Sequence, residues 1–143
     1  MSGTFSKDFY PTSYPNNETF EVLYVGRLTL NKGIAYLIEA FKKIDIKNKK
    51  LKMYGIMSQD GKEFFKNIDL SDDIEILSTV EFKDLKHIYS KSDVLVQPSL
   101  FDGWSLSVTE ALTCGCPVIT TFNTGASDIV KNGINCTNNN TSY

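Results

Sequence analysis

Two cationic side chains and two glycines stand close together in residues 26–33, GRLTLNKG, directly after an apolar run. Gly26 and Gly33 allow a backbone to approach phosphate oxygens, and Arg27 can donate a fork of hydrogen bonds. Lys32 adds a second charge just before a predicted helix, whose N-terminus favours anions. The segment matches neither the dinucleotide fingerprint G-x-G-x-x-G nor a Walker loop. From these residues alone, a phosphate site and a turn with two solvated cations both remain open.

Residues 98–110 form a second segment that could do chemistry, because they contain two carboxylates, Asp102 and Glu110. Asp102 and Gly103 are a typical turn pair. Ser107 and Glu110 have the spacing of a capping box, in which Ser107 starts a helix and Glu110 bonds back to it. A purely structural role and a ligand-binding role are therefore both open for the two carboxylates.

The other reactive or aromatic side chains carry a weaker signal. Trp104, the only tryptophan, follows the turn and could be a core side chain or the wall of a ligand pocket. Three cysteines are an odd number, and Cys114 and Cys116 have Cys-x-Cys spacing, which favours neither a disulfide framework nor a zinc site. We expect these two to be packing thiols, and we expect His87, the only histidine, on a solvated helix face. The sequence therefore predicts no metal site.

Short apolar runs alternate with helical patterns from Phe20 onward, and these elements must position the two segments. The predicted strands are residues 20–25, 51–56, 74–77, 94–97, 117–121 and 134–136. Helical spacing is clearest over 34–44, and weaker patterns lie around 64–68, 85–89, 106–112 and 129. The runs are almost continuously apolar, which is typical of strands covered on both faces. The alternation predicts an α/β fold, a doubly wound, Rossmann-like parallel sheet of about six strands with helices on both faces.

In such a sheet, ligands bind beyond the carboxyl ends of the strands. The loops to consider are those that follow Val25, Ile56, Leu77, Gln97 and Thr121. Residues 1–19 have no sustained period, and we interpret them as a strap between domains or an added linker. Residues 20–137 form the predicted domain. The polar residues 138–143 are interpreted as a disordered tail or an artificial end.

Composition excludes several function classes. The 143 residues suit one domain, with 41% apolar and 22% charged residues. Fifteen basic and seventeen acidic residues give a net charge of −2, so we expect no nucleic-acid binding. No apolar run approaches the roughly 20 residues that a membrane helix needs, and the first residues lack the apolar core of a signal peptide. A cytoplasmic location is therefore expected.

Three segments resemble a known family. Residues 98–119, PSLFDGWSLSVTEALTCGCPVI, are similar to the signature of GT-B glycosyltransferases of the glycogen-synthase and sucrose-synthase type, family 4 in particular, which has two acidic residues separated by seven others. Residues 25–41 resemble the same family's first strand and phosphate loop, and 124–133 resemble its next landmark. The order is the family's own, and the resemblance covers about residues 20–137. It implies the C-terminal, donor-binding half of a GT-B enzyme.

The resemblance implies a role for each matched charged side chain. Arg27 and Lys32 match the cations that hold the diphosphate of the donor, so it implies no metal ion and no cofactor. Glu110 matches the acid that accepts hydrogen bonds from the ribose hydroxyls. Asp102 matches the acid near the transferred sugar, where the family usually has glutamate, which is one methylene longer. Arg27, Lys32 and Asp102 are the predicted catalytic residues.

The resemblance also implies donor contacts by uncharged residues, namely Gly26, Val80, Gly103, Trp104, Ser105, Leu106 and Ser107. Backbone amides of the 103–106 segment would meet the sugar and the diphosphate, aided by a helix dipole that starts near Ser107. Val80 matches the site of the base. Ser105 stands where the family usually has glycine, so the sugar would meet a different surface there.

The function implied by the resemblance is retaining transfer of a sugar from a nucleoside diphosphate to an acceptor hydroxyl of a glycan or a lipid-linked acceptor. A UDP-sugar is favoured, and a GDP- or ADP-sugar is open. The partner implied is an N-terminal acceptor-binding domain of the same enzyme, through which the enzyme could also contact a membrane. We expect the isolated chain to bind nucleotide weakly and to be inactive. A non-catalytic nucleotide-sugar-binding or scaffold module and a nucleotide-sugar epimerase on the same fold are the alternatives.

Overall fold

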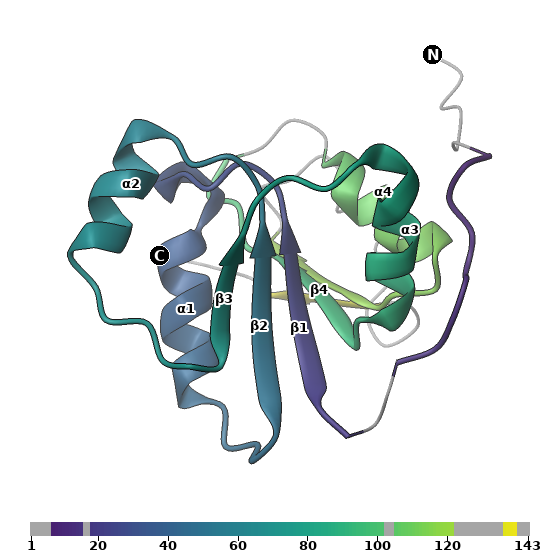
Figure 1. The fold of residues 1–143 in the computed structure, drawn as a ribbon, viewed down its shortest axis with the longest axis horizontal. Helices are drawn as coiled ribbons and strands as arrows, with labels where there is room; N and C mark the ends of the chain where they lie inside the picture. The colour runs from purple at the N-terminus through teal and green to yellow at the C-terminus, as the bar shows by residue number, and fades with distance from the viewer. Residues whose placement is uncertain (1–6, 16–17, 102–104, 122–135, 140–143) are drawn as a thin grey trace.

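Six parallel strands form a single sheet in the computed structural model, which describes residues 7–15, 18–101, 105–121 and 136–139. The strands are β1 (Phe20–Val25), β2 (Lys49–Tyr54), β3 (Ile74–Leu77), β4 (Val94–Gln97), β5 (Val118–Thr121) and β6 (Cys136–Asn139). Their order is β3-β2-β1-β4-β5-β6, and every pairing is parallel. The doubly wound α/β fold expected from the sequence is thereby confirmed (Figure 1).

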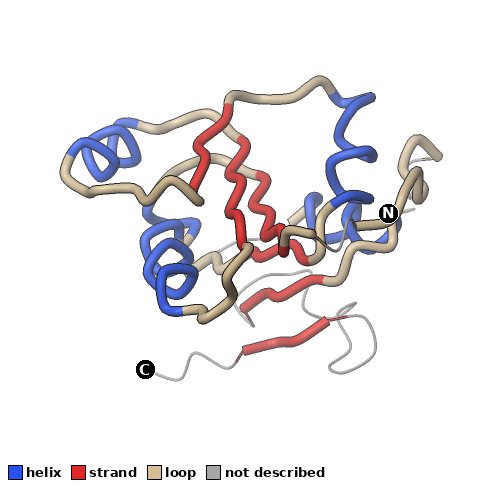
Figure 2. The backbone as a smooth tube through the Cα atoms, turned by 60° about the horizontal axis from the view of Figure 1, so that its bottom comes forward, coloured by secondary structure: helices blue, strands red, loops and turns tan. Residues whose placement is uncertain are grey.

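Helices cover both faces of the sheet (Figures 1 and 2). Helices α1 (Ile34–Lys43) and α2 (Gln59–Lys66) lie on one face, and α3 (Phe82–Lys91) and α4 (Leu106–Thr113) lie on the other. A short 3-10 helix, η1 (Leu30–Lys32), precedes α1. This two-sided cover explains the apolar runs of β1 and β4.

Side chains of β1 divide between two hydrophobic cores. Val22 and Tyr24 pack with the apolar face of α1, whereas Leu23 packs with α3 and α4. The α1 face consists of Ile34, Leu37, Ile38 and Phe41, all buried. Burying one such side chain contributes about 1.5–3 kcal/mol, so the predicted helix face is a main source of stability for this layer.

Three strands differ from their predicted bounds. Strand β2 covers Lys49–Tyr54 instead of residues 51–56, because its pairing with β1 runs from Phe20 to Val25, and Ile56 is 65% exposed rather than part of the strand. Strand β5 begins at Val118 because Pro117 has no N–H to donate to the ladder. Strand β6 covers Cys136–Asn139, later than the predicted 134–136. The helix predicted near residue 129 lies outside the described residues.

Residues 7–15, within the predicted strap, pack along α3. Phe9 is buried, and its ring contacts the ring of Tyr89 edge to face at a centroid distance of 6.1 Å. The Thr12 amide donates to the Ser90 hydroxyl at 3.0 Å. This stretch therefore contributes to the same core as α3 and α4.

Candidate functional site

The strand order reverses between β1 and β4. The chain winds from β1 through β2 to β3 on one side, then crosses to β4 and continues to β5 and β6 on the other. In doubly wound sheets, the crevice for a ligand lies beyond the carboxyl ends of the two strands at this reversal. The loops there are residues 26–33 after β1 and residues 98–105 after β4. They are the two segments that the sequence singled out.

The two loops are held side by side. The Leu100 amide donates to the Asn31 carbonyl at 3.1 Å. Gly33 has a φ of 73°, and a Cβ at this position would lie 2.0 Å from the Pro98 carbonyl oxygen. Only glycine therefore fits at this contact. Lys32, which is half-buried, is next in sequence to both contact points, so its backbone lies at the same edge as the β4 loop.

Backbone contacts also fix the start of the loop after β1. The Tyr24 hydroxyl donates to the Arg27 carbonyl at 2.7 Å, and the Gly26 amide donates to the Tyr54 carbonyl at 3.0 Å. The Arg27 side chain is exposed. An anchored backbone with an exposed guanidinium is suited to binding an anion from solution.

Asp60 of α2 orders the rest of this loop, a role that the sequence did not indicate. Its Oδ2 accepts from the Leu30 amide at 2.9 Å and from the Thr29 hydroxyl at 2.8 Å. Hydrogen bonds from the Ser58 hydroxyl first, then from Leu30 and Thr29, lower the pKa of Asp60 well below its ordinary range. The available signal was a serine two residues before an aspartate at a helix start, with Ser58 as the N-cap of α2.

The second helix terminus at this edge belongs to α4. Ser105 is its N-cap, Leu106 is its first residue, and the hydroxyls of Ser105 and Ser107 lie 3.0 Å apart. The capping box that the spacing of Ser107 and Glu110 suggested does not form, because Ser107 is already inside the first turn and Glu110 bonds to Tyr89 of α3. The Ser105 side chain makes no capping hydrogen bond.

Glu110 lies half-buried between α4 and α3. Its Oε2 accepts a hydrogen bond from the Tyr89 hydroxyl at 2.7 Å. Burial raises the pKa of Glu110, and the bond from Tyr89 opposes that rise. Burial, together with the Glu110 charge, raises the pKa of Tyr89, so the phenol remains a donor. A partly accessible carboxylate with one fixed partner can accept further hydrogen bonds from a ligand.

Two buried acceptors at the end of β4 have no hydrogen-bond partner among the described residues. Gln97 is 3% exposed with an unpaired Oε1, and Ser99 is 0% exposed with an unpaired Oγ. Leaving such a group unpaired costs about 1–3 kcal/mol. The Thr121 hydroxyl donates to the Ser99 carbonyl at 2.6 Å. The backbone of the loop is therefore fixed at Ser99, although the Ser99 hydroxyl makes no hydrogen bond within the described residues. Such groups can accept hydrogen bonds from a ligand or from water.

The remaining predicted site residues have different positions relative to the carboxyl edge of the sheet. Asp102, Gly103 and Trp104 lie outside the described residues. Val80 is half-buried after β3, on the same carboxyl edge but at the outer strand. His87 is exposed, as expected, with Nδ1 2.9 Å from the Thr12 hydroxyl.

Cys114 and Cys116 are free and buried, which agrees with packing thiols. Burial raises the pKa of both, that of Cys116 to about 12. Within the described ranges, no group of three or more His, Cys, Asp or Glu residues could hold a metal ion. The same part of the chain contains no helix with the length and apolarity to cross a membrane.

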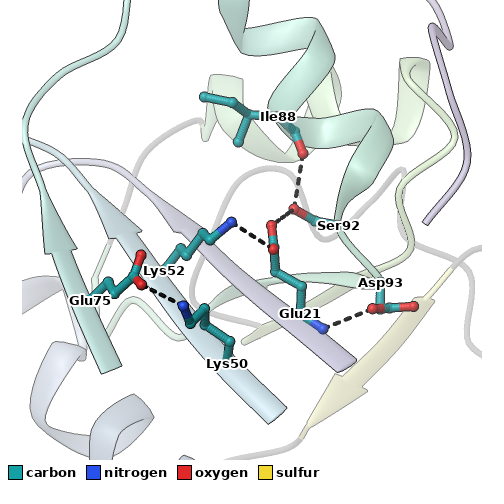
Figure 3. Close-up of polar contacts among 7 residues, drawn as sticks. All are labelled: Glu21, Lys50, Lys52, Glu75, Ile88, Ser92 and Asp93. Carbon is teal, nitrogen blue, oxygen red and sulfur yellow. Dashed lines mark hydrogen bonds and ion pairs between the residues drawn. The ribbon is translucent and has the colours of Figure 1, made fainter. Parts of the chain in front are cut away.

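The opposite, amino edge of the sheet has a different character (Figure 3). Lys52 on β2 pairs with Glu21 on β1 at 2.7 Å, and Lys50 pairs with Glu75 on β3 at 2.5 Å. The Glu21 amide donates to Asp93 at 2.8 Å. A hollow of about 480 Å³ opens here, lined in part by these lysines, Glu21 and the preceding strap. Its lining contains three lysines and two glutamates, and Lys52 and Lys50 are held in the ion pairs given above.

A comparison with protein families identifies the family. The family model for glycosyl transferases group 1 matches residues 7–141. The chain belongs to this family. The match includes the stretch from residue 7 that packs along α3, and the fold is that of the C-terminal half of a GT-B glycosyltransferase.

Individual relatives agree. The capsular polysaccharide biosynthesis glycosyltransferase CapM of Staphylococcus aureus is 35% identical over 123 residues, which cover 82% of this chain and 32% of CapM. The chain thus spans about a third of the length of such group 1 glycosyltransferases.

Solved structures of this type superpose closely. Sucrose-phosphate synthase from Thermosynechococcus elongatus aligns with a TM-score of 0.80 at 27% identity, over 92% of this chain and 36% of the synthase. HepE of Anabaena, in complex with UDP-glucose, aligns with a TM-score of 0.75 at 21% identity, over 86% of this chain and 35% of HepE. The resemblance found in the sequence is therefore confirmed.

Proposed function

We propose that this chain is the donor-binding domain of a retaining, metal-independent hexosyltransferase that uses a nucleoside-diphosphate sugar. The observation that carries the proposal is the joining of the loops after β1 and β4, through the Leu100 amide and the Asn31 carbonyl. It keeps the cation-bearing loop beside the segment that opens α4. Both lie at the strand-order reversal, where such sheets bind ligands.

In the proposed complex, Arg27 and Lys32 neutralise the diphosphate. A charge-assisted hydrogen bond to phosphate contributes about 1.5–3 kcal/mol, and the N-terminal amides of α4 add a partial positive charge. Ser105, Leu106 and Ser107, which open α4, would meet the diphosphate or the sugar. Asp102, Gly103 and Trp104 remain proposed sugar contacts from the sequence resemblance alone.

The proposed reaction is a front-face displacement. The bond from the anomeric carbon to the leaving diphosphate oxygen breaks as a bond to the acceptor oxygen forms on the same face. The proton of the acceptor hydroxyl passes to the departing diphosphate. The main work of Arg27 and Lys32 is then to stabilise the charge that develops on that diphosphate.

The nucleoside would be recognised farther along the edge. We propose that the half-buried Glu110 carboxylate accepts from the ribose hydroxyls and that Val80 contacts the base. A UDP-sugar is favoured over a GDP- or ADP-sugar because HepE, which shares the fold, was solved with UDP-glucose.

A second domain would complete the enzyme. Because the chain spans about a third of its relatives, we propose that an N-terminal domain binds the glycan or lipid-linked acceptor and that the chain alone transfers nothing. We propose a role in polysaccharide synthesis by analogy with CapM. The proposed location is cytoplasmic, and any membrane association would come from the N-terminal domain.

A thermal-shift panel of UDP, GDP, ADP and UDP-glucose tests the donor proposal. At ten times the dissociation constant, a ligand stabilises the fold by about 1.4 kcal/mol, which corresponds to a rise of about 4 °C in melting temperature. We expect that rise with UDP and UDP-glucose, and none in the Arg27→Ala, Lys32→Ala double variant. Equal shifts in the double variant would contradict the assigned site, and no shift with any nucleotide would contradict the function.

A further inference from the structure

Tyr89 is a buried residue of α3 that reaches the nucleotide edge of the sheet through a single contact. It is 0% exposed, and its hydroxyl donates to Glu110 Oε2 at 2.7 Å. The two residues are 21 positions apart and belong to different helices. None of the sequence patterns connected Tyr89 with a ligand.

The surroundings of Tyr89 leave its hydroxyl little freedom. The ring packs in the core with Leu95 of β4 and Val108 of α4, and Phe9 covers it from the segment before β1. A buried phenol without a partner costs about 1–3 kcal/mol, so the bond to Glu110 is strongly favoured. A flexible carboxylate is therefore tied to a rigid core side chain, which lowers the entropy that Glu110 loses when it binds a ligand.

We propose that Tyr89 is a positioning residue, which orients the Glu110 carboxylate so that its other oxygen accepts hydrogen bonds from the ribose hydroxyls of the donor. This role rests on the proposed function of Glu110. Tyr89 itself touches no ligand, and it acts only through the carboxylate that it holds.

The positioning role of Tyr89 also predicts a change in the pKa of Glu110 when the Tyr89 hydroxyl is removed. Burial raises the Glu110 pKa and the Tyr89 hydroxyl opposes that rise, so removing the hydroxyl leaves the burial effect alone and raises the pKa further. Among the described residues, the other titratable groups around the pair are Cys114 at the C-cap of α4, Cys116 just after it and Lys86 on α3. Burial raises the pKa of both thiols, so they stay neutral where Glu110 titrates. The Lys86 ammonium donates to the Tyr10 hydroxyl at 2.9 Å and is unchanged in the variants.

The test compares four forms of the chain: wild type, Tyr89→Phe, Glu110→Ala and Tyr54→Phe. Tyr54→Phe is a matched control, because Tyr54 packs against the same core as Tyr89 without bonding to Glu110. Each form is titrated calorimetrically with UDP and with 2′,3′-dideoxy-UDP, which lacks the ribose hydroxyls, from pH 5 to pH 8. Thermal melting of each form reports on its fold.

We expect Tyr89→Phe to bind UDP about fivefold to tenfold more weakly than wild type, because the Glu110 carboxylate must then lose its conformational freedom when it binds the ribose. Its binding of the dideoxy probe should be unchanged. The pH at which UDP binding is half lost should also be higher than in wild type. The titration of UDP itself is common to all forms, so the difference between forms isolates Glu110. Tyr54→Phe should match wild type in every readout.

The outcomes separate the two proposals. If Glu110→Ala weakens UDP binding and Tyr89→Phe does not, the positioning role is overturned and the ribose role of Glu110 stands. If Tyr89→Phe weakens both probes equally with no shift in pH, Tyr89 has only a structural role and the inference is overturned. If Glu110→Ala binds as wild type does, or wild type binds no UDP, the proposed function fails and the inference fails with it.

Discussion

The two edges of the sheet hold their charged side chains in different ways. At the amino edge, Lys52 pairs with Glu21 and Lys50 with Glu75, at 2.7 and 2.5 Å. At the carboxyl edge, the Arg27 side chain is exposed, and Gln97 Oε1 and Ser99 Oγ are buried without a hydrogen-bond partner in the part of the chain that the structure describes. Ser13 Oγ in the lining of the amino-edge hollow is also without such a partner, so the difference between the edges lies in their cations. It teaches that lysines held in ion pairs stabilise the sheet, whereas an exposed guanidinium is available to an anion.

The carboxyl edge also depends on close backbone contact, and breaking that contact should have the largest effect. In Gly33→Ala, the new Cβ meets the Pro98 carbonyl oxygen at 2.0 Å, and the residue must keep a φ of 73°. We expect a loss of about 3 kcal/mol in the free energy of unfolding, measured by urea denaturation, together with loss of UDP binding.

Gly115→Ala is the control for that substitution. Gly115 has a similar φ of 79°, but its nearest new neighbour would be Pro11 Cγ at 3.8 Å. Only backbone strain of about 1 kcal/mol should remain. Equal losses in the two variants would mean that the contact between the loops does not matter.

The cations of the two edges should differ in their effect on affinity. Arg27→Ala combined with Lys32→Ala should weaken UDP binding about 30-fold or more, because two charge-assisted contacts are lost. Lys50→Ala should leave UDP binding unchanged and lower stability by no more than about 1 kcal/mol, since its ion pair is partly exposed. Calorimetric titration and urea denaturation check both. A similar loss of affinity in Lys50→Ala would place the nucleotide at the wrong edge for our proposal.

Replacing each of two buried serines by alanine should change the free energy of unfolding in opposite directions. Ser92 and Ser99 are both 0% exposed. The Ser92 hydroxyl lies 2.9 Å from the Ile88 carbonyl and 3.2 Å from Glu21 Oε1, so Ser92→Ala should destabilise the fold by about 1 kcal/mol. Ser99→Ala removes an unpaired hydroxyl and should stabilise the unliganded fold by a similar amount. Urea denaturation distinguishes them, and destabilisation by Ser99→Ala would show that its hydroxyl is satisfied.

The smallest expected effects are on the pH dependence of stability, and they concern two carboxylates whose pKa values shift in opposite directions. Burial raises the pKa of Glu110, so its contribution to stability is present at low pH and is lost as pH rises through the folded pKa. A hydrogen bond from Lys50 lowers the pKa of Glu75, so its contribution is present near neutral pH and is lost as pH falls.

Glu110→Gln should therefore melt at or above the wild-type temperature at pH 7, with the advantage disappearing below the ordinary glutamate pKa. Glu75→Gln should melt slightly below wild type at pH 7, with the deficit disappearing at acid pH. Melting curves from pH 3 to pH 8 give both results. Parallel curves for the two variants would contradict the assigned environments.

Elements set by local pattern could be predicted from the sequence. The helix over 34–44 was indicated by apolar spacing, and α1 covers Ile34–Lys43. Strands β1, β3 and β4 have the predicted bounds. These elements need only bury an apolar face or run against a neighbouring layer, and the spacing of apolar residues in the sequence indicates that face directly.

Contacts between elements could not be predicted in the same way. The spacing of Ser107 and Glu110 suggested a local capping box, but Glu110 bonds instead to Tyr89, because the packing of α3 against α4 brings a buried phenol to its carboxylate. Asp60 orders the loop after β1 from a helix about 30 residues away. Arg27 and Lys32 were indicated by the resemblance together with their loop, and their roles stay predictions.

Amide chemical-shift mapping with UDP on the isotope-labelled chain tests the central claim most directly, since it reports on both edges at once. The account predicts that saturating UDP shifts the amides of residues 26–33, 99–101 and 105–110, while those of Lys50, Lys52 and Glu75 do not move. Shifts concentrated on the lysines and glutamates of the amino edge, with the loops after β1 and β4 unchanged, would contradict it.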